Sequence, residues 1–90
     1  MVVSILAKIK SKKKSDYFII LGGGLDQKYL IENVKSLGYK IILFDKNKNC
    51  FASKKVNLFL NINFQNYKKI IFELKKLKKK NNIQYHGILT

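Results

Sequence analysis

Short apolar runs alternate with segments of helical periodicity along the chain, and this alternation restricts the fold more than any other feature. Tyr17–Leu21 and Lys40–Phe44 are rich in β-forming apolar residues, as expected for strands that are buried on both faces of a sheet. Leu25–Leu37 lies between them and repeats its apolar residues at helical spacing. A strand, a helix and a second strand in this order predict a parallel βαβ unit with a right-handed crossover.

A second strand–helix–strand unit is predicted after the polar loop at residues 46–55. Val56–Ile62 alternates apolar residues with asparagine, which indicates a strand near an edge of the sheet. Asn66 is placed to cap a helix that begins at Tyr67 and ends before Asn81. Gly87–Thr90 indicates a fourth strand. We therefore expect an α/β domain, three-layer and Rossmann-like, with a four-stranded parallel sheet in the order 3-2-1-4.

Each predicted helix has one apolar stripe, which we expect to face the sheet. In the first helix the stripe comprises Leu25, Tyr29, Leu30, Val34 and Leu37, and in the second it comprises Tyr67, Ile70, Ile71, Leu74 and Leu77. The aromatic residues Tyr67 and Phe72 fall on or beside the second stripe, so core packing is expected to account for them.

The chain has 90 residues and a formal charge of +14, and its basic residues are all lysine. A charge of this size fits either a surface for nucleic acid or anionic membrane, or a solvated surface of lysine-biased composition. Arginine, which reads guanine and grips phosphate with two hydrogen bonds, is absent. We therefore favour the second interpretation and expect neither a nucleic acid nor a membrane as a partner. No apolar run reaches the roughly 18 residues of a membrane span.

Residues 1–15 and two single residues bear on location and chemistry. Residues 1–15 place an apolar stretch before a basic one, the reverse of a secretory signal, and predict a basic leader or short helix ahead of a domain at 16–90. Cys50 is the only cysteine, which excludes an internal disulfide and fits a reducing compartment, so a cytoplasmic location is expected. His86 is the only histidine and is expected at a strand edge, without a catalytic or metal-binding role.

A glycine-rich turn, Gly22-Gly23-Gly24, joins the first strand to the first helix. Gly22 and Gly24 fit the first two positions of a dinucleotide-binding fingerprint, and Asp45 is placed where an acidic residue would bind the ribose. Gln27 occupies the position of the third glycine, so the fingerprint is incomplete. A structural turn, or a turn that contacts another ligand, is favoured over binding of NAD.

The same residues, with others in order along the chain, resemble the N-terminal domain of ATP-grasp enzymes such as carbamoyl-phosphate synthase, biotin carboxylase and the purine-pathway ligases. The segments that carry this resemblance are Ile19–Gly24, Gln27, Leu37–Ile42, Asp45–Asn47 and Gly87–Thr90. The resemblance covers the chain from about residue 16 to its last residue.

The resemblance implies the substrate-side domain, or a fragment, of a ligase or carboxylase that joins a carboxylate to a nucleophile through an acyl phosphate. It implies that ATP and magnesium are bound by further domains, and that this chain alone binds no cofactor and supplies no catalytic residue. Gly22, Gly23 and Gly24 would face a small substrate with a carboxylate or phosphate, with Asp45 and Asn47 at the rim. Further ATP-grasp domains or a second copy of the chain are the expected protein partners. The alternatives are a stand-alone nucleotide-binding module and a basic nucleic-acid-binding domain.

Overall fold

The computed structural model describes residues 16–89, and the segment predicted as a leader at 1–15 lies outside them, as does Thr90. The elements in chain order are strand β1 (Asp16–Leu21), the 3₁₀ turn η1 (Leu25–Gln27), helix α2 (Lys28–Ser36), strands β2 (Lys40–Phe44) and β3 (Leu58–Leu60), helix α3 (Tyr67–Asn81) and strand β4 (Gln84–Leu89). The strands form one sheet in the order β3-β2-β1-β4, and every neighbouring pair is parallel. The predicted fold class and strand order are confirmed.

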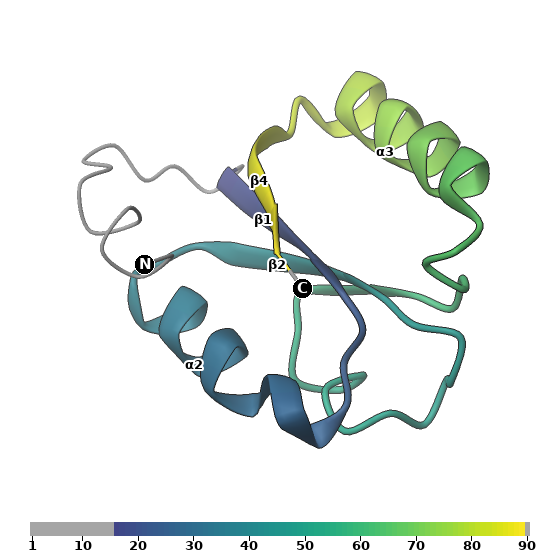
Figure 1. Ribbon diagram of the computed structural model, residues 1–90. Coiled ribbons are helices and arrows are strands. Elements are labelled where there is room, and N and C mark those ends of the chain that lie inside the picture. Colours follow the sequence, from purple (N-terminus) through teal and green to yellow (C-terminus); the bar gives the residue numbers. More distant parts are fainter. Residues whose placement is uncertain (1–15, 90) are drawn as a thin grey trace.

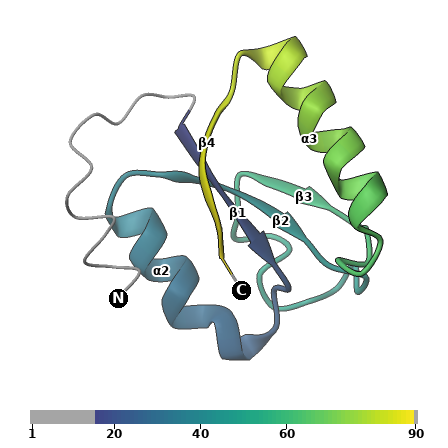
Figure 2. The same ribbon diagram turned by 45° about the horizontal axis from the view of Figure 1, so that its top comes forward.

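The two helices lie on opposite faces of the sheet (Figures 1 and 2). On one face, Ile31 and Val34 of α2 pack against alternate residues of the central strands, among them Ile20. On the other face, Ile70 of α3 packs against the residues between them, among them Ile19. Because both faces are covered, the central strands have no polar face, as the apolar runs predicted.

The Asn residues at both ends of β3 explain why this strand is shorter than predicted. The predicted strand at Val56–Ile62 is confirmed only over Leu58–Leu60. The side chain of Asn57 accepts a hydrogen bond from the Ile41 N–H at 2.9 Å, and the Asn61 amide donates to the carbonyl oxygens of Asp45 and Lys46, both at 2.9 Å. These side chains replace main-chain ladder bonds, so regular pairing stops on either side.

Strand β4 begins at Gln84, three residues before the predicted Gly87, and contains a bulge. Tyr17 pairs with Tyr85, but Ile19 pairs with Ile88, so β4 has one extra residue opposite Phe18. The hydroxyl of Tyr85 donates to the Leu74 carbonyl at 2.6 Å, which ties the strand to helix α3.

The expected helix stripes are partly wrong. Tyr29 and Leu25 are 75% and 66% exposed, and the buried residue that the prediction lacked is Ile31. Tyr29 and Val34 are five residues apart, which places them about 140° apart around a helix, so they cannot both face the sheet. In α3, Tyr67 and Phe72 are each 62% exposed, and Ile71 is 47% exposed. Core packing therefore does not account for these two aromatic residues.

Candidate functional site

The predicted site residues meet at the carboxyl edge of the sheet, where β1 and β2 end. Gly22 continues the pairing of these strands, because its N–H donates to the Phe44 carbonyl at 2.8 Å, and it then turns the chain at φ 91°. Asp45 and Asn47 follow directly after β2. The edge at which parallel strands end is the usual place for a ligand in an open α/β sheet.

The Asp45 carboxylate binds the two loops of this edge together. One oxygen, Oδ2, accepts from the Gly23 N–H at 2.8 Å, and the other, Oδ1, accepts from the Asn47 N–H at 2.8 Å. Burial alone would raise the pKa of Asp45, but the hydrogen bonds from Gly23, Asn47 and the Cys50 thiol, together with the charge of Lys46, hold it below the ordinary value. Asp45 is therefore ionised and already has hydrogen-bond donors at both oxygens.

Gly23 is a packing residue in this arrangement. A Cβ at this position would lie 2.6 Å from Leu43 Cδ2, 3.1 Å from Cys50 Sγ and 3.2 Å from Ala52 Cβ. Its carbonyl accepts from the Ala52 N–H at 2.9 Å, and its own N–H is bonded to Asp45. Both main-chain polar groups of Gly23 are therefore used within the protein.

Gly24 differs from Gly23, because its N–H has no hydrogen-bond partner among residues 16–89. It has φ −70° and ψ 174° and immediately precedes η1. The closest obstacle to a Cβ there is Oδ1 of the exposed Asp26, at 2.9 Å. Of the three glycines, Gly24 thus offers an unused donor, and the Asp26 carboxylate lies beside it.

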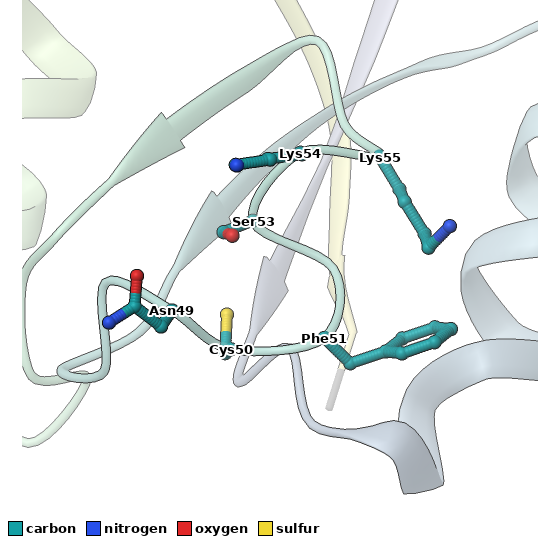
Figure 3. Close-up of a pocket in the computed structure, with 6 residues that line it drawn as sticks. All are labelled: Asn49, Cys50, Phe51, Ser53, Lys54 and Lys55. Atoms are coloured by element: carbon teal, nitrogen blue, oxygen red, sulfur yellow. The ribbon is translucent and has the colours of Figure 1, made fainter.

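An open hollow of about 440 Å³ lies on the loop between β2 and β3, beside the glycine turn (Figure 3). Its lining comprises Asn49, Cys50, Phe51, Ser53, Lys54 and Lys55. The Lys55 ammonium lies 5.1 Å from the centre of the Phe51 ring, and the Lys55 carbonyl accepts from the Lys35 ammonium at 2.7 Å. The lining holds two lysines and no carboxylate, so the hollow suits an anionic group. The prediction from sequence lacked this hollow, although an aromatic residue in a polar loop was a signal for it.

Cys50 and His86 do not form a nucleophile and base. Cys50 is buried beside Gly23, and burial, with the nearby Asp45 carboxylate, raises the pKa of its thiol, which disfavours the reactive thiolate. His86 lies on the edge strand β4, as expected, and its Nε2 atom lies 3.1 Å from Oδ1 of the buried Asp16 without forming a hydrogen bond. Nothing in the described range supports covalent catalysis by Cys50.

No group of three or more His, Cys, Asp or Glu side chains within residues 16–89 could hold a metal ion. In that range there is also no helix with the length and apolar character needed to cross a bilayer.

Comparisons with protein-family models, with curated proteins and with solved structures found no match to this chain.

Proposed function

We propose that the chain is the N-terminal, substrate-side domain, or a fragment, of an ATP-grasp ligase or carboxylase. In this proposal it presents a small acceptor that carries a carboxylate or phosphate to ATP-binding domains outside this chain. It contributes position, since holding two reactants in the correct geometry lowers a barrier without acid–base chemistry. ATP and magnesium belong to those other domains, and the location is cytoplasmic.

The observation that carries the proposal is the Asp45 carboxylate, which joins Gly23 to Asn47 across the ends of β1 and β2. Three residues of the family resemblance thus form one connected edge, although Gly23 lies 22 positions before Asp45 in the sequence. The resemblance and the strand order both support this proposal. The strand order brings the ends of β1 and β2 together, and a substrate-side domain needs such a rigid edge to hold the acceptor.

The same contacts argue against a dinucleotide-binding module. In that module, the acidic residue accepts from a ribose hydroxyl and the second glycine lets the main chain approach a pyrophosphate. Here both Asp45 oxygens accept main-chain N–H groups. The Asp26 carboxylate lies beside Gly24 and would repel a phosphate placed close to it.

The acceptor is proposed to lie between the Gly24 N–H and the hollow on the β2–β3 loop. The two are adjacent, because Cys50 and Ala52 of that loop pack against Gly23. Lys54 would attract the anionic group of the acceptor, while Gly24 donates a hydrogen bond. The Asp26 carboxylate suits the amino group of an amino-acid acceptor, which would place opposite charges at the two ends of the site.

Binding measurements on the full chain test this proposal. Isothermal calorimetry and ligand-shifted melting would be run with ATP and magnesium, NAD, bicarbonate, and carbamoyl and amino-acid acceptors. We expect no binding of ATP or NAD, and acceptor binding that is at most weak, with a dissociation constant of about 1 mM or above, equivalent to about 4 kcal/mol. Micromolar binding of NAD or ATP would instead identify a complete nucleotide-binding module.

Two variants locate the acceptor. Lys54→Gln removes a charge from the hollow, and Lys48→Gln is its matched control on the same loop, because Lys48 is exposed and does not line the hollow. Where an acceptor binds, Lys54→Gln should weaken it several-fold and Lys48→Gln should leave it unchanged. Equal effects would show that only the net charge of the chain matters.

A further inference from the structure

The outward face of helix α3 combines an uncovered aromatic ring with a dense set of lysines. Phe72 is 62% exposed and lies on the side of the helix away from Ile70, which is buried against the sheet. Residues three and four positions away are the neighbours of a helical side chain. All four such neighbours of Phe72 are exposed lysines: Lys68, Lys69, Lys75 and Lys76.

These charges are not neutralised within the protein. Helix α3 holds seven of the 19 lysines and one acidic residue, Glu73, which is half-buried. None of the seven ammonium groups forms an ion pair or a hydrogen bond with another residue in the range 16–89, and none lies over the Phe72 ring. Asp26 and Glu32 belong to η1 and α2, and α2 covers the opposite face of the sheet (Figure 2).

We infer that this face of α3 binds single-stranded nucleic acid without sequence preference. Proteins of that kind combine cations that follow the phosphate backbone with an aromatic ring on which a base stacks. Phe72 would supply the stacking surface, and the four surrounding lysines would contact phosphates. The absence of arginine fits binding that does not read bases, because lysine acts on phosphate as a point charge.

The face fits the other candidate partners less well. The centre of a protein–protein interface is poor in lysine, whereas Phe72 has lysine at all four positions three and four residues away. A helix that lies on a membrane turns its apolar stripe toward the lipid, but Ile70, Leu74 and Leu77 pack inward against the sheet. Charge complementarity and the free ring together point to a nucleic acid strand.

Fluorescence anisotropy with a labelled oligothymidylate of about 12 nucleotides tests the inference on the full chain. Affinity should fall steeply between about 50 and 200 mM salt. Phe72→Ala should weaken binding roughly 5- to 100-fold, the range found when a stacking aromatic is removed. Tyr29→Ala is the matched control, since Tyr29 is 75% exposed, follows a lysine and lies on the opposite face, and it should leave affinity unchanged.

Replacing the four neighbouring lysines by glutamine tests the phosphate contacts separately. The slope of log K against log salt should become shallower by about 0.7 for each lysine that contacts a phosphate. Urea unfolding of each variant verifies that the fold persists. Equal affinity of wild type and Phe72→Ala would overturn the inference, as would equal losses in Phe72→Ala and Tyr29→Ala. Poly-glutamate or anionic phosphatidylserine vesicles that bind as tightly as the oligonucleotide, with the same dependence on Phe72, would also overturn it.

Discussion

Asp45 and Gly23 show how single residues hold the carboxyl edge of the sheet. The carboxylate accepts two main-chain N–H groups, and the missing side chain of Gly23 leaves room for Cys50 and Ala52. Gly23 is buried and Asp45 is half-buried, and the contacts that the structure shows for both residues stabilise this edge. The two contributions can be tested separately, because Asp45 acts through the charge of its carboxylate and Gly23 acts through the small volume that it occupies.

Asp45→Asn is expected to destabilise the fold at neutral pH by about 1 to 2 kcal/mol. The two carboxylate oxygens accept one N–H group each, whereas an amide has a single oxygen and its NH₂ group cannot accept the second N–H. The folded-state pKa of Asp45 lies below its ordinary value of 3.8. Its stabilisation is therefore present above that value and is lost as the pH falls through the folded-state pKa. Urea unfolding of both proteins at about pH 7, 5 and 3 measures this.

The difference between wild type and Asp45→Asn should be constant from about pH 7 to pH 5 and shrink below the ordinary carboxyl value. A difference that stays the same down to pH 3 would mean that the ionised carboxylate contributes nothing beyond its shape.

Gly23→Ala is expected to destabilise the protein by roughly 1 to 3 kcal/mol, the range for overpacking a core. The new Cβ would lie 2.6 Å from Cδ2 of Leu43, which is fully buried, so the Leu43 side chain or the turn would have to shift. Gly24→Ala is the control, because φ is −70° there and the nearest atom belongs to the exposed, flexible Asp26. Thermal or urea unfolding of the two variants compares them, and equal stabilities would show that the Gly23 packing is not tight.

At the scale of elements, the sequence predicts the strands and helices that are defined by the spacing of apolar residues. It does not predict where a strand ends when side chains replace main-chain hydrogen bonds. The apolar runs predict β1 and β2 because a strand that is buried on both faces is apolar over nearly all its length. The pattern does not predict the ends of β3. Asn57 and Asn61 fit the alternation of a strand, but their side-chain amides form hydrogen bonds where main-chain groups of a longer strand would pair. The start of β4 was missed because a bulge interrupts its register.

The same division applies to the candidate site. The strand order implied that Gly22–Gly24 and Asp45 would meet at one edge, since the ends of adjacent parallel strands lie side by side. It did not imply that Asp45 would bond inward to Gly23, which depends on the path of the loop. The hollow around Phe51 depends on the same path, because all its lining comes from one non-periodic segment.

Asn57→Ala is expected to cost about 1 to 3 kcal/mol of stability, because it leaves the N–H of the fully buried Ile41 without its acceptor. Asn61→Ala is the matched control at the other end of β3. Asn61 is exposed and the carbonyl groups that it contacts can be hydrated, so its loss should cost less than about 1 kcal/mol. Urea unfolding distinguishes them, and a larger loss for Asn61→Ala would contradict this account of how the strand ends.

For the whole molecule, two features oppose each other. The outer edge of β4 pairs with no strand among the described residues, and Ile88 on this strand is 59% exposed. An open edge of this kind favours pairing with another chain. The formal charge of +14 opposes association of two copies, since like charges repel over about 10 Å at 0.1 M ionic strength.

Association of the chain with itself should therefore depend on salt. We expect sedimentation velocity to find monomers at low ionic strength and a growing dimer fraction as salt screens the lysines, the reverse of the salt effect expected for nucleic acid binding. Ile88→Lys places a charge on the open edge and should abolish the dimer while leaving the monomer folded, because an exposed residue contributes little to the core. Lys48→Glu, in the β2–β3 loop, lowers the net charge and should shift dimerisation to lower salt. If Ile88→Lys dimerises as wild type does, the edge of β4 is not the contact between the two copies.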